Sequence, residues 1–314
     1  MIDGLLLHLY NWNIKIMKYP LSLPILAAIA CLSFTNHRLS PAIPQYKHVI
    51  IVIEENHNYD ALIGSANAPY ITKLSEGGAL FTNSHGIGHP SQPNYLALFS
   101  GSTHGITNDK CLENETPYTT PNLGAALIAK DLTFKGYAET MPSVGYLPCY
   151  YKTSTLTGQY LYGRKHAPWV NWTGTKVNNI PIADSMPFGY FPKDYNNLPT
   201  VAFVIPNMDN DMHSIGAPGD AAAIQRGDKW LNENIEKYAE WAKTHDSLLI
   251  ITFDEDDSRT SANQIPTIFY GAHIKTGKYN EYITHYNVLH TIEAMFKLSA
   301  DDNQNANPIM NVWK

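Results

Sequence analysis

Apolar segments of two kinds alternate along most of the chain. Continuous apolar runs with β-branched residues, which are typical of strands covered on both faces of a sheet, occur at 48–53, 200–205 and 248–253, and shorter candidates occur at 134–138 and 265–270. Segments with the spacing of an amphipathic helix occur at 123–130, 229–243 and 288–298. Strands that alternate with helices predict the α/β class, with a three-layer α/β/α sandwich around a mostly parallel central sheet.

Polar side chains follow the three longest apolar runs. Glu55 and Asn56 come directly after the first run, and Asp254 and Glu255 come after the last. The second run leads into the polar stretch 207–213. Ligands of open α/β sheets bind at the carboxyl ends of the strands. Any one of these exits could be an ordinary polar loop, but clustered carboxylates repel each other unless a cation lies between them. Together they predict a metal site.

A turn at 88–94 places Ser91 at the start of an apolar, helix-like run. A hydroxyl in that position faces the unpaired N–H groups of the first turn and the positive end of the helix dipole. A phosphoryl group can be held against a nucleophile there. Serine is also a common helix N-cap, so this segment alone leaves both roles open.

The domain organisation follows from periodicity and length. Residues 46–300 can bury the core of a single catalytic domain. Within it, the stretch 151–198 shows little periodicity and is too long for an ordinary connection. We therefore expect it to be an irregular insertion that covers the site, and we expect 301–314 to be a C-terminal tail.

Residues 1–35 have the pattern of a signal or leader segment. Lys18 precedes an almost wholly apolar run at 21–34, which is short for a membrane span. Cleavage, lipidation at Cys31 and retention as a membrane anchor all stay open. The pattern predicts a secreted or periplasmic protein.

Charge argues against a nucleic-acid-binding protein, and the cysteine content suggests a disulfide. The net charge is −6 over 314 residues and no cluster of lysine and arginine appears, which argues against a nucleic-acid partner. Beyond the leader, Cys111 and Cys149 remain. An even number of cysteines in an exported protein suggests a disulfide, which would contribute roughly 4 kcal/mol. Two free buried thiols are the alternative, and the lack of CxxC spacing argues against zinc.

Six motifs occur in order along the chain: Glu-Asn-His-Asn-Tyr-Asp at 55–60, His-Pro-Ser-Gln-Pro-Asn-Tyr at 89–95, Tyr-Ala-Glu at 137–139, Arg-Lys-His-Ala-Pro at 164–168, Pro-Asn-Met-Asp-Asn-Asp-Met-His at 206–213 and Phe-Asp-Glu at 253–255. From about residue 48 to residue 298 the chain thereby resembles the phosphoesterase family of secreted acid phosphatases and phospholipases C. That family belongs to the alkaline-phosphatase-like superfamily.

The resemblance implies a metal-dependent phosphoester hydrolase, most simply an acid phosphatase that acts on phosphomonoesters through a phosphoserine. Ser91 would be the nucleophile. Asn94 and the backbone N–H groups near Gln92 would hold the phosphoryl oxygens. One divalent ion of unknown identity would be bound by Glu55, Asn56, Ser91, Asp254 and Glu255.

Histidines complete the implied site. His166 and His213 are candidates for donors to the phosphoryl group or acids for the leaving group, and His89 is a candidate for substrate binding. His104 and His285 are weaker candidates. Asp209 lies four residues before His213, a spacing that relatives use for a second metal. Glu255 stands where two-metal relatives have histidine, which argues against that second ion. Asp256 and Asp257 are expected in a solvated turn, with a supporting place behind the metal ligands as the alternative.

Three other functions are compared with these motifs. A sulfatase would need arginine where Tyr95 stands, so that reading is excluded. A phospholipase C-type phosphodiesterase and a non-catalytic binding module on the same scaffold remain as alternatives. The partner would be a small phosphorylated substrate or a phospholipid head group. Neither the natural phosphoester nor the oligomeric state follows from the sequence.

Overall fold

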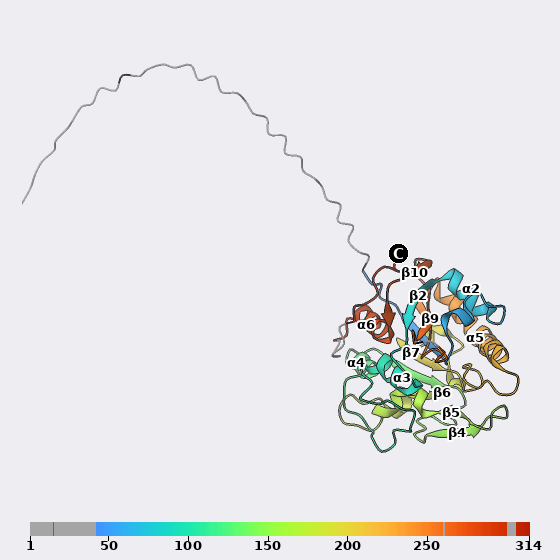
Figure 1. Ribbon diagram of the computed structural model, residues 1–314. Coiled ribbons are helices and arrows are strands. Elements are labelled where there is room, and N and C mark those ends of the chain that lie inside the picture. Colours follow the sequence, from blue (N-terminus) through green and yellow to red (C-terminus); the bar gives the residue numbers. More distant parts are fainter. Residues whose placement is uncertain (1–14, 16–41, 260, 300–305) are drawn as a thin grey trace, which may run out of the picture. The chain divides into compact units, whose positions relative to one another are not determined.

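A mixed β-sheet forms the centre of the fold. The computed structural model describes residue 15 and residues 42–259, 261–299 and 306–314. Within them the strands lie in the order β10-β2-β9-β8-β1-β7-β3-β6, and β11 pairs with β2 (Figure 1). The strands are β1 His48–Glu54, β2 Ala79–His85, β3 Phe134–Ala138, β6 Ser185–Pro187, β7 Val201–Ile205, β8 Ser247–Phe253, β9 Gln264–Gly271, β10 Gly277–Tyr279 and β11 Ile283–Thr284. Strand β9 is antiparallel to β2 and β8, and the other pairs are parallel.

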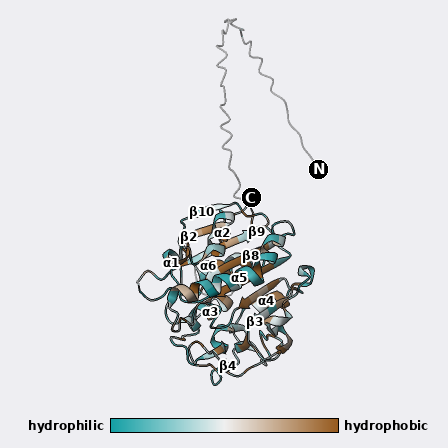
Figure 2. Cartoon of the chain, turned by 90° about the vertical axis from the view of Figure 1, so that its right-hand side faces the viewer, coloured by the Kyte–Doolittle hydropathy of each residue, from teal (hydrophilic) through white to brown (hydrophobic). Residues whose placement is uncertain are grey.

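Helices cover both faces of this sheet (Figure 1). One layer contains α3 Ser91–Ser100, α4 Leu123–Ile128 and α6 His285–Met295, and the other contains α1 Tyr59–Leu62, α2 Pro69–Gly77 and α5 Asp220–Ala242. Side chains alternate along a strand, so β1 packs Ile51 against the first layer and Val52 against the second. Central strands are accordingly apolar on both faces (Figure 2). The predicted three-layer sandwich and mostly parallel sheet are confirmed.

The stretch expected to be an irregular insertion contains more regular structure than its sequence suggested. It contributes most of a two-stranded hairpin, β4 Tyr150–Thr153 and β5 Tyr160–Gly163, and its strand β6 joins the main sheet beside β3. Five 3-10 helices follow β5: η1 Arg164–His166, η2 Pro168–Trp172, η3 Ile182–Asp184, η4 Phe188–Tyr190 and η5 Tyr195–Asn197. The expectation of irregular structure is therefore wrong for a large part of 151–198, whereas its expected position over the site stays a prediction.

Two tryptophans explain why this stretch belongs to the body of the fold. Trp169 and Trp172 are fully buried in the same core as α3 and α4. Trp169 lies so close to β3 that a Cβ atom at Gly136 would fall 2.1 Å from its ring. Glycine at position 136 is what allows the indole to lie against the strand. The aromatic content of the stretch therefore reflects core packing.

The two ends of the chain are described to different extents. The expected leader at 1–35 lies outside the described residues, apart from residue 15. Part of the expected tail at 301–314 is described, and there Val312 and Trp313 are buried against the core. The prediction of a C-terminal tail is thus wrong for residues 306–314. No helix in the described part of the chain has the length and apolar character needed to cross a bilayer.

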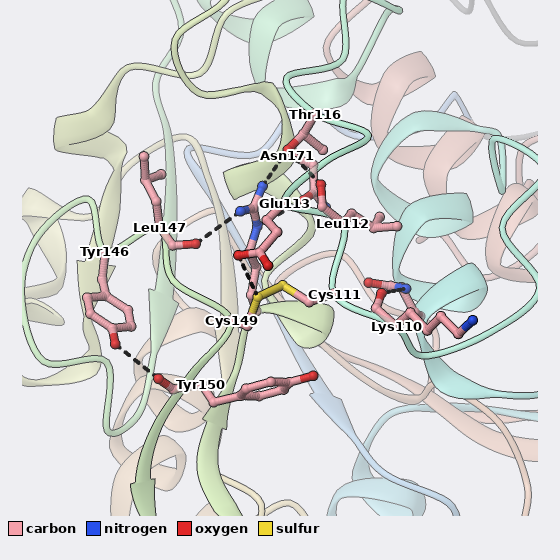
Figure 3. The surroundings of a disulfide bond; sticks show 12 residues. Lys110, Cys111, Leu112, Glu113, Thr116, Tyr146, Leu147, Cys149, Tyr150 and Asn171 are labelled. Atoms are coloured by element: carbon pink, nitrogen blue, oxygen red, sulfur yellow. Dashed lines mark hydrogen bonds between the residues drawn. A yellow bond between two sulfur atoms is a disulfide. The ribbon is translucent and has the colours of Figure 1, made fainter.

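Cys111 and Cys149 form a disulfide (Figure 3). The bond joins the loop that follows α3 to the residue immediately before β4. The predicted pairing is confirmed, and the alternative of two free thiols is wrong.

Candidate active site

Three parallel strands end side by side, as the sequence predicts. Strand β1 lies between β7 and β8 and is parallel to both. Beyond their ends, the N–H of Asn56 donates to Asp254 Oδ1 over 3.1 Å, and the N–H of Glu55 donates to the carbonyl of Asp211 over 2.8 Å. These bonds hold the residues after all three strands at one edge of the sheet.

Ser91 is the first residue of α3 and is only 1% exposed. Its Oγ lies 3.1 Å from Glu55 Oε2 and 3.2 Å from Glu255 Oε1. The N-cap position is occupied by Pro90, and no side chain caps the helix. The alternative in which Ser91 acts as the N-cap is therefore wrong, and its hydroxyl faces the carboxylates instead.

The oxygen atoms around Ser91 suit a divalent cation. A serine hydroxyl has one proton to donate, yet two carboxylate oxygens lie within reach of it. Asn56 Oδ1 and Asp254 Oδ2 are also buried without a hydrogen-bond partner. Burial, followed by the charges of Asp254 and Asp211, raises the pKa of Glu55 well above its usual value. A group of buried oxygens that lacks positive charge fits a hard cation.

A second group adjoins the first through Glu55. Ligand atoms of Glu55, His166 and Asp211 lie within 4.8 Å of one another, and all three residues are buried. Burial, with the nearby charge of Lys165, lowers the pKa of His166 well below 6.5. The neutral imidazole lies 3.1 Å from Glu55 Oε1 and 3.7 Å from Asp211 Oδ2, and such a ring can bind a metal.

Asp211 belongs to the site, although the spacing in the sequence points to Asp209 as the partner of His213. The two Asp209 oxygens instead lie 2.7 and 2.9 Å from Ser154 Oγ, which donates to them. Asp211 is the acid that faces the site, and its Oδ1 accepts the N–H of His213 over 2.9 Å. The motif at 206–213 contained the signal, but the four-residue spacing selected the wrong aspartate.

His213 and His89 differ in how far they are exposed and in which residues they lie beside. His213 is half-buried, its ring is 6.2 Å from that of His166, and burial followed by Lys165 lowers its pKa to about 4. His89 Nδ1 lies 2.5 Å from Glu255 Oε2, and its side chain is 34% exposed. His89 is therefore at the rim, whereas His166 and His213 lie deeper.

Asn94 supports the turn that carries Ser91. Its Oδ1 accepts from the N–H groups of Ile87 and Gly88, over 2.7 and 3.3 Å. Its amide donates to the carbonyls of Gly88 and Pro90, over 2.8 and 3.2 Å. These four bonds use the full capacity of a side-chain amide. The expected substrate-binding role is thus corrected to a supporting one.

The weaker candidates have structural contacts. His104 stacks on Tyr118, and His285 Nε2 lies 2.6 Å from the backbone oxygen of Asp254 at the start of α6. Asp256 is 1% exposed, so the expected solvated turn is wrong for it. Asp257 accepts from Asn58 over 3.2 Å. The contacts of His285 and Asn58 help to hold the acidic loop at 254–257 in place.

Two further residues of the site were missed from the sequence. Tyr95, used there only to exclude a sulfatase, donates its hydroxyl to Glu55 Oε1. Lys165 is buried with its Nζ 2.6 Å from Asp109 Oδ2. Burial acts to lower the pKa of Lys165, but the charges of Glu55 and Asp109 outweigh it and raise the pKa. Lys165 therefore stays charged, and its place beside His166 in the motif at 164–168 was the available signal.

A cavity of about 250 Å³ opens beside these groups. Its walls include Asn56, His213, Glu255 and Arg259. It has room for a small polar substrate. A larger hollow of about 420 Å³ is lined mainly by residues of α2, α5 and the turn before α2, and it contains none of the site residues.

Without a bound cation, the free energy of unfolding is expected to fall as the pH rises through neutrality. Burial raises the pKa of Asp254 from 3.8 to about 7; burial and the charge of Asp254 raise that of Glu255 from 4.5 to about 9. Between about pH 5 and pH 7 the folded state keeps protons that the unfolded chain has lost, so stability falls by about 1.4 kcal/mol per pH unit for each such proton. Denaturant titration of chelator-treated protein across this range measures the slope.

A saturating divalent ion is the control. The same carboxylates would then bind the ion in their charged form, which should flatten the slope. Metal-free protein whose stability rises over this pH range would contradict the raised pKa values.

Comparison with known proteins identifies the family. The model of the Phosphoesterase family matches residues 65–299, which include Ser91, Asp254 and Glu255. A phosphatidylinositol-3-phosphatase from Mycobacterium tuberculosis is 47% identical over 275 residues, which cover 87% of this chain and 84% of that protein. An acid phosphatase from Aspergillus fumigatus is 30% identical over 252 residues, which cover 78% of this chain and 53% of that protein. The chain thus spans about half the length of this fungal relative.

Solved structures support the same fold. A protein of the alkaline phosphatase superfamily from Vibrio parahaemolyticus superposes with a TM-score of 0.56 at 13% identity, over 82% of this chain and 69% of that one. A lipoteichoic acid synthase from Listeria monocytogenes gives a TM-score of 0.56 at 12% identity, over 85% and 76%. These structures bear on the fold alone. The matched family and the phosphatase relatives argue against a non-catalytic binding module. The chain belongs to the Phosphoesterase family and is a hydrolase that acts on phosphoric esters.

Proposed function

We propose that this protein is a metal-dependent acid phosphatase that hydrolyses phosphomonoesters through a phosphoserine intermediate. The observation that carries the proposal is the position of Ser91 Oγ at the first residue of α3, between Glu55 Oε2 at 3.1 Å and Glu255 Oε1 at 3.2 Å. A helix N-terminus attracts a phosphoryl group. Carboxylates beside the hydroxyl can take its proton or hold the ion that activates it.

We infer that one divalent ion is bound by five residues, Glu55, Asn56, Ser91, Asp254 and Glu255. The unpartnered buried oxygens of Asn56 and Asp254 support this set, and oxygen ligands favour a hard ion. Such an ion would lower the pKa of the serine hydroxyl and offset charge on the phosphoryl oxygens. His166 and Asp211 form, with Glu55, an adjoining group that could hold a cation.

The protein groups divide the proton transfers between them. Ser91 Oγ forms the new bond to phosphorus while the bond to the ester oxygen breaks, and the serine proton passes to Glu255. The departing alkoxide receives that proton from Glu255 through His89, which lies beside Glu255 at the rim. Water then attacks the phosphoserine and gives its proton to the same pair. The proton passes from Glu255 to Ser91 Oγ as the bond from Oγ to phosphorus breaks, which releases inorganic phosphate and restores the hydroxyl.

Three further groups offer positive charge or hydrogen bonds to the phosphoryl oxygens. Lys165 remains protonated. His166 and His213 have lowered pKa values, so near neutral pH their rings act as neutral donors. Positioning and charge stabilisation supply most of the rate in phosphoryl transfer.

The natural substrate is proposed from a relative. The most similar protein described above is named a phosphatidylinositol-3-phosphatase, so a phosphorylated lipid head group is a natural candidate beside small soluble phosphomonoesters. The disulfide between Cys111 and Cys149 supports a location outside the cytoplasm, where such bonds persist.

Hydrolysis of p-nitrophenyl phosphate by purified protein tests the proposal. Exhaustive chelation is expected to lower turnover at least about a hundredfold, and a divalent ion should restore it, because the hydroxyl loses its activating charge. Undiminished turnover in protein that elemental analysis shows to be free of metal would contradict metal dependence. Faster hydrolysis of bis(p-nitrophenyl) phosphate would favour the phospholipase C-type alternative.

A further inference from the structure

The carboxylate of Asp109 joins α3, the helix that begins with Ser91, to the buried Lys165. Asp109 Oδ2 lies 2.6 Å from Lys165 Nζ, and Asp109 Oδ1 accepts the N–H of Gln92 over 2.9 Å. Gln92 directly follows Ser91. The N–H expected to face a phosphoryl group is therefore turned toward Asp109, and the same side chain holds the ammonium group of the site.

The loop around Asp109 is itself held from α3. The side-chain amide of Gln92 donates to the carbonyls of Asn108 and Lys110, both over 2.9 Å. Those residues flank Asp109 on either side. The first turn of α3 thus grips the loop at three points, which limits how far the carboxylate of Asp109 can move relative to Ser91.

The disulfide, whose surroundings are shown in Figure 3, links the loop that contains Asp109 to the segment before Lys165. Cys111 lies two residues after Asp109 and is bonded to Cys149, whose carbonyl accepts the N–H of Arg164 over 2.9 Å. Arg164 precedes Lys165, and its guanidinium donates to Leu147, Thr116 and Asn171. A path from Asp109 through the disulfide to Lys165 therefore returns to Asp109 through the ion pair.

This closed path of contacts matters for the site because the lysine it holds is buried. The Lys165 side chain is 5% exposed, whereas that of Asp109 is 31% exposed. A buried ammonium group needs a fixed partner, and a charge-assisted bond to a carboxylate supplies one with defined geometry. If Asp109 loses its charge, Lys165 can turn toward other carboxylates of the site, of which Glu55 acts on it most strongly.

We propose that Asp109 is a positioning residue of this active site, which aligns Lys165 with the first turn of α3, and that the Cys111–Cys149 disulfide keeps Asp109 in place. The inference rests on the proposed function, because Lys165 is assigned there to the phosphoryl group. Displacement of a catalytic group by about 1 Å can cost about a hundredfold in rate.

Steady-state kinetics of Asp109→Asn with p-nitrophenyl phosphate is the first test. We expect kcat/KM to fall about ten- to a hundredfold, chiefly in kcat, with metal content unchanged. Asp109→Glu should recover at least a third of wild-type activity, since it keeps the charge. Combining Asp109→Asn with Lys165→Met should give no further loss beyond Lys165→Met alone, because the two residues act in series.

Glu113→Gln is the matched control, since Glu113 is an exposed carboxylate beside the same disulfide (Figure 3); it should retain wild-type kinetics. A Cys111→Ala/Cys149→Ala protein tests the second half of the proposal and remains informative if Asp109→Asn does not fold. We expect its kcat/KM to fall about tenfold. Folded protein with wild-type kinetics after either change would overturn the corresponding half.

Affinity for inorganic phosphate, measured by calorimetry, separates this inference from the proposed function. A wild-type protein without turnover would defeat the proposed function. Weaker phosphate binding in Asp109→Asn, with Glu113→Gln unchanged, would still support the alignment of Lys165. Equal phosphate affinity together with equal kinetics would overturn it.

Discussion

Ser91→Ala is expected to lower kcat at least about a thousandfold, because it removes the protein atom proposed to bond to phosphorus. The hydroxyl contacts Glu55 and Glu255 and makes no capping bond in α3. The helix should therefore form without it. Turnover of p-nitrophenyl phosphate, with circular dichroism and thermal unfolding of the same preparation, measures both parts of this result.

Ser75→Ala provides the matched control. Ser75 is also a buried helical serine, but its Oγ donates to the carbonyl of Thr72 in α2, and it has no contact with the site. It should keep wild-type turnover. Activity of Ser91→Ala within tenfold of wild type would remove Ser91 from the mechanism.

Glu55→Gln is expected to lose most of the bound metal and at least about a hundredfold in turnover at a fixed metal concentration. Glu55 contacts Ser91, Tyr95 and His166 and belongs to both groups that could bind a cation. Glutamine keeps the shape but removes the charge, so the change isolates the carboxylate. Elemental analysis of dialysed protein and a metal titration of turnover measure the effect.

Glu54→Gln is an unusually close control for this change. Glu54 is adjacent in sequence and equally buried, and its two oxygens also have no hydrogen-bond partner. It lies on the alternate face of β1, with Ile50 and Val52, away from Ser91. Its metal content should match that of the wild type. Full metal occupancy in Glu55→Gln would show that Glu55 is not a ligand.

The fold was predictable where burial on both faces left a continuous apolar run. Strands β1, β7 and β8 could be predicted for this reason. The polar residues that follow them indicated the edge of the sheet at which Ser91 lies. Strand β2 was missed because its second half contains Thr82, Asn83 and Ser84. The start of α5 at Asp220 was placed too late, since its first turns contain alanine, glycine and charged residues.

The parts of the site that depend on contacts between distant segments could not be predicted from the sequence. Spacing could not separate Asp209 from Asp211, because the choice depends on the backbone bond between Asp211 and Glu55. Nothing local connects Asp109 with Lys165 either. The aromatic stretch at 151–198 was interpreted as a cover because the residues that bury its tryptophans, such as Gly136, lie elsewhere in the chain.

The contact between Trp169 and Gly136 has a consequence for folding. Lys165 and His166 lie within four residues of Trp169, so the segment that brings them to Glu55 is the one whose indole closes the core over β3. The chain cannot assemble its reaction centre on a loosely formed interior. Enzymatic turnover would then report on completion of the core itself, and a partly unfolded form with this segment undocked would be catalytically silent.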